Sequence, residues 1–436
     1  MASTAPEYLD TPALPLGGLA EHLARYVAER ADGPLPPAPG PGALVEDLCG
    51  AAVLRARLGE PDALDLVDQA AAHAASTNAA GVWSGPGLVM TSALIAESAL
   101  GPGRTSLADD AVGWLAVRAR SLSRRQTVRA RPGAPLMVYD TVEGLSGVGR
   151  VLLEVATADT WLRGAPAGRT AQRSARTCLE TLTAILAPHD GDWPGWWLPA
   201  SDHPDPSRAH PTGAALTGAA HGVAGPLSLL AAAALRGAVV EGQREAIRHA
   251  ARRLLGWADT LPGGARAWPV AVTGAQLRTG ARPVPAPFPA AVTWAEGTPG
   301  IARALQLAAA ALEDDALHAA AGDLLGSLAA RTAVLPDRRP DLFRGVAGVM
   351  HAALSARADG PAAREQGDRA GELAHRAAEA LLPMFRPHAP YGFTDAAGNP
   401  QRLGLLHGAA GVACSLADYA GLPAGGIGWD VALMLR

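Results

Sequence analysis

The hydrophobic positions along the chain recur at the spacing of α-helices. In a first predicted helix at 19–30, Leu23 and Val27 fall on one side. A proline-rich stretch at 33–42 must interrupt this helix, because proline lacks the backbone N–H and clashes with the preceding turn. Beyond it, stretches rich in Ala and Leu alternate with loops containing Gly and Pro, and alternating Val, Ile and Thr are almost absent. The pattern predicts an all-α protein without a sheet.

A turn of small residues followed by an apolar helix repeats along the chain. Its six clear copies begin at Trp83, Glu143, Ala220, Ala295, Arg344 and Leu406, and their second glycines are Gly87, Gly147, Gly225, Gly300, Gly348 and Gly411. A weaker seventh copy begins at Asp47. Each interval has room for a second, more charged helix, such as 244–257 or 368–382. We therefore expect an α/α toroid, a double barrel of about seven inner and seven outer helices.

The repeated turns also suggest a site. Unpaired N–H groups at each helix start carry partial positive charge, and parallel inner helices would bring several starts to one end of the barrel. That end would suit an anion such as a thiolate or an enolate. Alternatively, the glycines only allow close packing. The turns are not phosphate-binding loops, because the chain has no Lys and no strand precedes them.

Composition excludes several classes of protein. The 436 residues have a formal net charge of -4, which does not favour nucleic acid as a partner. No apolar run is long enough for a membrane span, and the start of the chain lacks the features of a secretory signal. The three cysteines, Cys49, Cys178 and Cys414, cannot form a disulfide framework, so we expect a cytoplasmic protein. Residues 1–16 are expected to form an N-terminal tail and residues 17–436 a single domain.

Four segments carry a resemblance to a known family. They are YDTVEGLSGVGR at 139–150, GAAHGVAG at 218–225, WAEGTPGIARAL at 294–305 and LLHGAAGVA at 405–413. In order and spacing the chain resembles the lanthionine synthetase C-like cyclases, and the loop DWPGWWLP at 192–199 is similar as well. The resemblance implies an α/α toroid over roughly residues 17–436. It also implies an enzyme that adds cysteine thiols of a precursor peptide to dehydroalanine or dehydrobutyrine.

The resemblance also assigns roles to single residues. It places the family's acid/base pair on Asp140 and His221, and its zinc-binding histidine on His407. The two zinc-binding cysteines of the family fall on Ala295 and Leu406, which cannot bind a metal. We therefore expect no metal and no cofactor, and we regard His221 and His407 as the candidate bases.

Other roles remain open at these positions. Asp140 could instead cap the following helix, and His407 could have no present role. Trp83, Trp294, Glu296 and Arg344 are the expected substrate-binding residues. The two tryptophans could instead be hydrophobic lids, and Arg344 could bind a carboxylate or lie in solvent.

These features predict a zinc-independent cyclase that forms thioether rings in a ribosomal peptide. Its expected partners are a precursor peptide, with leader and dehydrated core, and separate kinase-like, lyase or dehydratase enzymes. The alternative is a non-catalytic scaffold that binds the precursor or those enzymes. A third possibility, a carbohydrate enzyme, would need two carboxylates that face each other across a cavity, such as Asp140 and Glu296.

Overall fold

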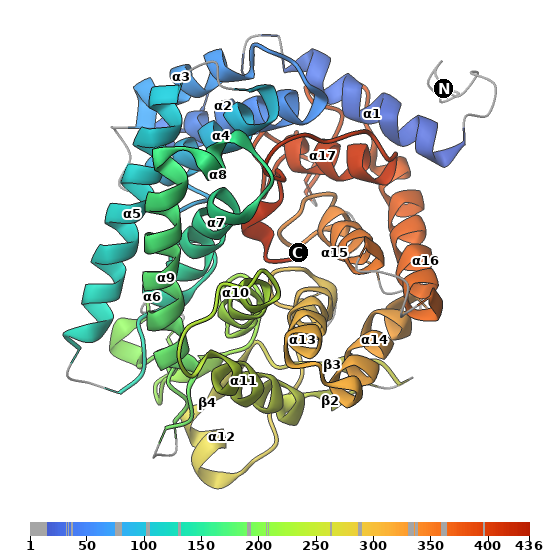
Figure 1. Cartoon of the computed structure of the whole chain (residues 1–436). Coiled ribbons are helices and arrows are strands. Elements are labelled where there is room, and N and C mark those ends of the chain that lie inside the picture. The colour runs from blue at the N-terminus through green and yellow to red at the C-terminus, as the bar shows by residue number, and fades with distance from the viewer. Residues whose placement is uncertain are drawn as a thin grey trace.

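Two concentric rings of helices form the protein (Figure 1). The computed structural model describes residues 15–31, 33, 35, 38–74, 81–101, 105–129, 132–189, 193–205, 207, 209–261, 264–286, 290–329, 335, 339–358, 364–395 and 397–436. Within these ranges the inner helices are α2 (Pro41–Leu58), α4 (Gly85–Leu100), α7 (Leu145–Thr157), α10 (Ala224–Leu235), α13 (Thr298–Leu312), α15 (Val346–Ala358) and α17 (Ala409–Tyr419). The outer helices are α1 (Leu16–Arg30), α3 (Ala63–Ala74), α5 (Thr105–Thr127), α9 (Pro166–Leu186), α11 (Gln243–Trp257), α14 (Asp315–Ala329) and α16 (Arg364–Leu381).

Each inner helix packs against its own outer helix, from α2 with α3 round to α17 with α1, and α17 contacts α2 to close the inner ring. The inner helices are buried on nearly every face, as in α10, where Ala224 to Ala233 are all buried. The outer helices bury one side only: α9 buries Cys178 and Leu182 but exposes Arg173. This contrast in burial confirms the predicted double barrel.

The structure corrects two expectations. It contains two short antiparallel sheets, in which β1 (Ala214–Leu216) pairs with β4 (Ala271–Thr273) and β2 (Asp259–Thr260) pairs with β3 (Arg266–Ala267). Strands of two or three residues are too short to produce an alternating pattern, so hydrophobic periodicity could not reveal them. The weak seventh turn at Asp47 is also absent, because α2 begins at Pro41 and runs through it.

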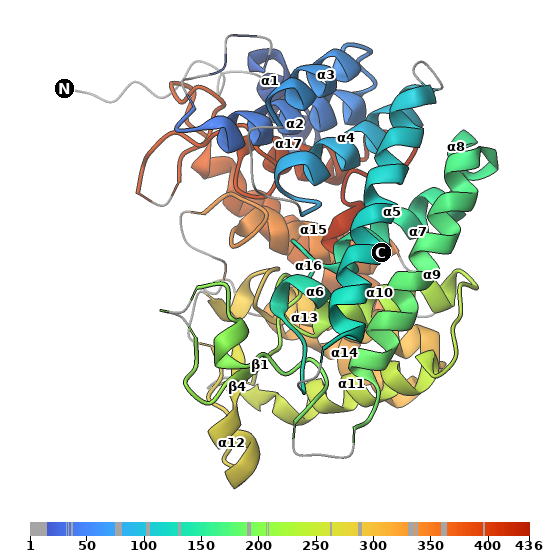
Figure 2. The same ribbon diagram turned by 90° about the vertical axis from the view of Figure 1, so that its left-hand side faces the viewer.

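Several short elements connect the rings. They are α6 (Leu136–Tyr139), α8 (Trp161–Gly164), α12 (Gly274–Thr279) and the 3-10 turns η2 (Ala200–Asp202), η4 (Ala290–Val292), η7 (Leu382–Met384) and η8 (Val431–Leu433). A capping box between Thr273 and Gln276 fixes the start of α12. Figure 2 shows α5 and α9 side by side along the outside of the barrel, and α12 projecting from one end.

The end of the chain fills the centre of the inner ring (Figure 1). Residues 429–435 are all buried, and η8 packs on α7. The indole N–H of Trp294 donates to the carbonyl of Leu433 at 2.9 Å, and the guanidinium of Arg303 donates to the carbonyl of Leu435. The barrel is therefore a packed core and not an open pore.

Two predictions concern the chain's ends and its environment. The predicted N-terminal tail, 1–16, lies outside the described residues except for Pro15 and Leu16, and α1 begins at Leu16. None of the described helices combines the length and the hydrophobicity needed to cross a bilayer.

Candidate active site

Backbone hydrogen bonds join the loops that precede five inner helices. The N–H of Thr141 donates to the carbonyl of Ala220, and Ala220 donates in turn to Ala295, both at 3.0 Å. Ala295 donates to Phe343 at 3.2 Å, and Phe343 donates to Leu406 at 3.0 Å. The starts of these helices therefore lie next to one another at one end of the barrel, as the repeat predicted.

The second glycine of each turn is required by packing. A Cβ atom on Gly147 would lie 2.1 Å from the carbonyl oxygen of Thr141, six residues earlier in the chain. The same relation recurs at Gly348, 2.0 Å from the oxygen of Leu342, and at Gly411. The alternative that these glycines allow close packing is therefore supported, and their repetition alone does not indicate a site.

Six side chains occupy equivalent places around this end, each immediately before the first small residue of its turn. We call them the mouth residues: Trp83, Glu143, His221, Glu296, Arg344 and His407. Five of the seven residues named from the sequence as site candidates are in this set. The other two, Asp140 and Trp294, lie beside it.

Asp140 and His221 form a hydrogen-bonded pair. Oδ2 of Asp140 lies 2.8 Å from Nδ1 of His221, and Oδ1 accepts the backbone N–H of Glu143 at 2.8 Å. The carboxylate is buried, whereas the His221 side chain is 38% exposed. Asp140 therefore both caps the turn before α7 and orients the imidazole. With the proton on Nδ1, the Nε2 atom is left as an acceptor.

The ring of Phe343 lies between the two candidate bases. Its centroid is 4.8 Å from the ring of His407 and 6.0 Å from that of His221. Desolvation of the ring lowers the pKa of His407, and the carboxylate of Asp341 opposes this shift. The surroundings therefore favour the neutral imidazole. The sequence analysis missed Phe343, although aligning the six turns would have placed it one position before Arg344.

Arg344 and Glu296 form an ion pair between the histidines. Nη2 of Arg344 bonds Oε1 of Glu296, and the guanidinium also lies over the ring of Phe343, 5.6 Å from its centroid. The backbone N–H of Arg344 donates to Oδ1 of Asp341 at 2.8 Å, which fixes the turn. Arg344 thus pairs with a carboxylate of the protein while its side chain is also 40% exposed, and a role in substrate binding stays a prediction.

The two tryptophans have different surroundings. Trp294 is fully buried, and its indole N–H is taken by Leu433, so its side chain forms a wall behind Phe343. Trp83 donates to the carbonyl of Ala432 at 3.3 Å and also lines a cavity. Substrate contact thus remains a prediction that the geometry favours for Trp83 over Trp294.

Two cavities open beside the mouth residues. One of 370 Å³ is lined by His221 and Glu296 together with apolar groups such as Leu198. The other, of 340 Å³, is lined by His407 and Trp83. Both have the size of a ligand pocket, and each makes one of the two histidines accessible from solvent.

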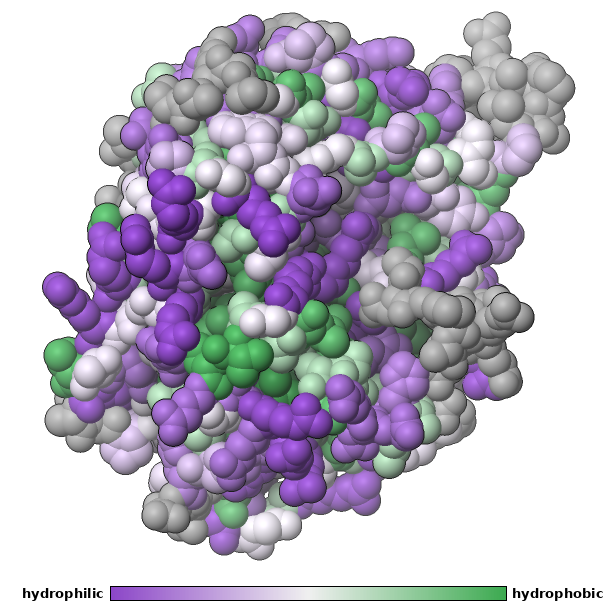
Figure 3. All heavy atoms as spheres, in the orientation of Figure 1, coloured by the Kyte–Doolittle hydropathy of each residue, from purple (hydrophilic) through white to green (hydrophobic). Residues whose placement is uncertain are grey.

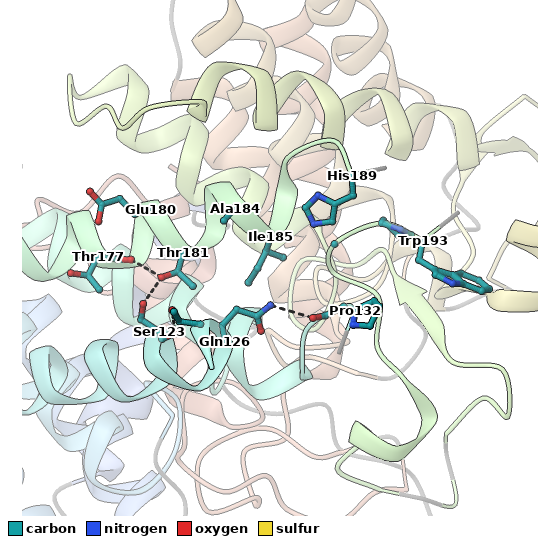
Figure 4. Close-up of a pocket in the computed structure, with 14 residues that line it drawn as sticks. Ser123, Gln126, Pro132, Thr177, Glu180, Thr181, Ala184, Ile185, His189 and Trp193 are labelled. Atoms are coloured by element: carbon teal, nitrogen blue, oxygen red, sulfur yellow. Dashed lines mark hydrogen bonds between the residues drawn. The ribbon is translucent and has the colours of Figure 1, made fainter. Parts of the chain in front are cut away.

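A larger cavity of 710 Å³ lies outside the barrel, between α5 and α9 (Figure 4). Ser123 and Thr181 are hydrogen-bonded at 2.5 Å on its wall, and His189 and Trp193 line its other side. Among the described residues that line it, no carboxylate is hydrogen-bonded to a histidine, so we assign the chemistry to the smaller cavities. Trp193 belongs to the loop 192–199 that carried part of the resemblance, and Asp192 in that loop lies outside the described residues.

A model of the lanthionine synthetase C-like protein family matches residues 61–422, most of the chain. The chain belongs to this family. Among solved structures, nisin cyclase matches this chain with a TM-score of 0.69 and 17% sequence identity. The match covers 96% of this chain and 97% of that one. At this identity the likeness shows the fold, an α/α toroid. The comparison with curated proteins finds no match.

The zinc site that the resemblance implies for the lanthionine synthetase C-like family does not fit the residues of this member. A tetrahedral zinc site needs about three protein ligands, but buried Ala295 and Leu406 offer only hydrocarbon beside His407. In the described part of the chain, no group of three His, Cys, Asp or Glu side chains could hold a metal ion. The charged and titratable side chains among the mouth residues are therefore those of Glu143, Glu296, Arg344 and the two histidines.

Proposed function

We propose that the protein is a zinc-independent cyclase that forms thioether rings in a ribosomal peptide. The observation that carries the proposal is the pair of buried Asp140 and half-exposed His221 at the edge of a 370 Å³ cavity. A carboxylate that fixes one imidazole nitrogen leaves the other free to exchange a proton with a bound substrate. Family membership supports a peptide substrate that carries dehydroalanine or dehydrobutyrine.

The reaction needs two proton transfers and one new bond. A histidine, either His221 or His407, takes the proton of the substrate cysteine, whose thiol has an ordinary pKa of about 8.5. The sulfur lone pair then forms a C–S bond to the β-carbon, and the displaced π electrons pass to the carbonyl oxygen as an enolate. The helix-start N–H groups stabilise this oxygen. His221 finally protonates the α-carbon, either with the proton that its Nε2 took from the thiol or, where His407 is the base, with the proton that His407 returns through solvent. Both imidazoles are neutral again at the end, and no other reactant is consumed.

The substrate and its context follow from this chemistry. The dehydrated residues must be made before cyclisation, so separate kinase-like, lyase or dehydratase enzymes supply them to this protein. The cavities lined by Trp83 and by Glu296, together with the exposed Arg344, hold the peptide so that its thiol and alkene meet. The three cysteines are free and buried, which is consistent with a cytoplasmic protein.

A scaffold function remains the second candidate, and one surface favours it. Figure 3 shows a hydrophobic patch over the end of α10, opposite the end with His221; Leu235 and Val239 there are 49% and 60% exposed. An adjoining groove of 430 Å³ is lined by Arg163 and Arg173 among others. Exposed apolar surface with a charged rim is typical of a protein–protein contact, which suits docking of a partner enzyme.

Counting free thiols distinguishes the two functions. Synthetic peptides with one cysteine and one dehydroalanine are incubated with the protein and compared with an uncatalysed control. A cyclase consumes thiols faster than the control, and His221→Ala should lose about 10²–10⁴-fold of the rate. The matched control is His375→Ala, because His375 lies on the outer helix α16. Tight peptide binding without acceleration would instead show a scaffold.

A further inference from the structure

The ion pair between Arg344 and Glu296 lies in the middle of the mouth. The backbone ladder runs from Ala220 through Ala295 and Phe343 to Leu406, so the loop of Arg344 lies between the loops of Glu296 and His407. The Arg344 side chain is 40% exposed and the Glu296 side chain 16% exposed. A positive charge is thus exposed to solvent next to Glu296, which lines the cavity beside His221.

The guanidinium of Arg344 has hydrogen-bonding capacity left over. Arginine has five N–H donors, and one of its terminal nitrogens binds Glu296. Its Nε–H is buried and finds no acceptor among the described residues. The ring of Phe343 packs beneath the guanidinium and excludes water from that side. The buried Nε–H cannot be reached from solvent, but the side chain is 40% exposed, so its other terminal N–H groups can bind a second anion without giving up Glu296 entirely.

The surroundings favour a small, singly charged and weakly hydrated anion. Phe343, Leu406 and Ala295 provide apolar walls without donors. The other charged or titratable groups close to Arg344 are Asp341, His407 and Arg339, whose charges also act on one another. Two carboxylates, Glu296 and Asp341, would repel a doubly charged phosphate. A thiolate, in contrast, is singly charged and tolerates apolar neighbours.

We infer that Arg344 binds the substrate cysteine as its thiolate, with Glu296 holding the guanidinium in place and competing for its charge. The inference rests on the proposed function, because the substrate thiol supplies the anion. The S–H proton passes to a histidine and the sulfur keeps both electrons as it lies against the guanidinium. The positive charge of Arg344 thereby stabilises the thiolate at a site whose residues do not fit zinc.

The pKa of a bound thiol tests this inference without any chemistry. The probe is the synthetic peptide with alanine in place of dehydroalanine, at saturating concentration, and its thiolate is followed by ultraviolet absorbance against pH. The protein's own thiols are silent near neutral pH, because burial raises the pKa of Cys49 and Cys178 to about 12 and raises that of Cys414 as well. We expect the bound thiol to titrate about one unit or more below the free peptide.

Charge variants give opposite expected shifts. Arg344→Gln should remove the lowering of the thiol pKa, and Arg344→Lys should keep part of it. Glu296→Gln should lower the thiol pKa further, because the guanidinium loses its competitor. The matched control is Arg25→Gln, which removes an exposed arginine of the outer helix α1 and should leave the shift unchanged. Absence of binding or of a shift in the wild type, or an undiminished shift in Arg344→Gln, would overturn the inference.

The thiol-counting assay separates this inference from the proposed function. A lowered thiol pKa that depends on Arg344, without any ring formation, would refute the cyclase and leave the thiolate site standing. Ring formation at the wild-type rate in Arg344→Gln, without a pKa shift, would refute the thiolate site and leave the cyclase standing.

Discussion

At the scale of single residues, Asp140 shows why two interpretations of one carboxylate need not exclude each other. Its Oδ1 caps the turn before α7, and its Oδ2 meets His221. The capping role could be predicted from the local sequence, because the acceptor and donor are three residues apart. The pairing with His221 spans 81 residues, so only the family resemblance could suggest it. Phe343 has neither a capping pattern nor a place in the family resemblance, and only an alignment of the six turns could have pointed to it.

Replacing Asp140 by Asn separates these two roles. Asparagine keeps an oxygen that accepts a hydrogen bond from the N–H of Glu143. Its amide nitrogen, however, cannot accept a hydrogen bond from the Nδ1–H of His221. We expect the cyclisation rate to fall about 100-fold or more while the unfolding midpoint changes little. Asp314→Asn, at the capping carboxylate that accepts the N–H of Leu317, is the matched control and should leave the rate unaltered. A full rate in Asp140→Asn would contradict the orienting role.

At the scale of elements, helix periodicity was sufficient for most of the structure. The predicted helices at 19–30 and 244–257 correspond to α1 (Leu16–Arg30) and α11 (Gln243–Trp257). Periodicity did not predict the structure correctly where contacts between distant parts of the chain determine it. Gly50, which suggested a turn after Asp47, lies inside α2, where a Cβ would meet the carbonyl oxygen of Leu403 at 2.3 Å. A glycine that admits a neighbouring backbone cannot be told from a turn glycine by sequence alone.

Two glycine substitutions test the packing of the turns. Gly147→Ala places a Cβ against the carbonyl of Thr141 and should lower the free energy of unfolding by about 2 kcal/mol or more. Gly113→Ala, in the exposed middle of α5 where nothing lies within 4 Å, should raise it by about 0.5–1 kcal/mol. Urea titrations of both variants measure these changes. Equal effects of the two substitutions would show that the turn does not constrain Gly147.

At the scale of the whole molecule, a buried charge cluster anchors the end of the chain. Nε2 of His351 lies 2.8 Å from Oδ2 of Asp430, which also accepts from Nε of Arg436 at 2.9 Å. Asp418 bonds Arg57 of α2 at 2.6 Å and so ties α17 to the first inner helix. The repeat predicted the ring, but these partners are up to 361 residues apart and could not be predicted from local patterns.

Asp430→Asn tests this cluster through its pH dependence. Burial alone would raise the pKa of Asp430, but Arg436 and His351 outweigh it and hold the pKa well below its usual range. The stabilisation is therefore complete above the unfolded pKa of about 3.9 and is lost as the pH falls further. We expect a loss of about 3 kcal/mol at pH 7 that shrinks by pH 3, measured by urea unfolding. Glu180→Gln, in the exposed pair with Arg176, should change little at either pH.

The ladder that links Thr141, Ala220, Ala295, Phe343 and Leu406 uses main-chain atoms only. The hydrogen bonds of this ladder therefore do not depend on which side chains the mouth residues carry. Mutation can exchange the reactive groups one at a time while the helices keep their places. Proteins that share this ladder can therefore lose one catalytic activity and gain another while each intermediate sequence still folds.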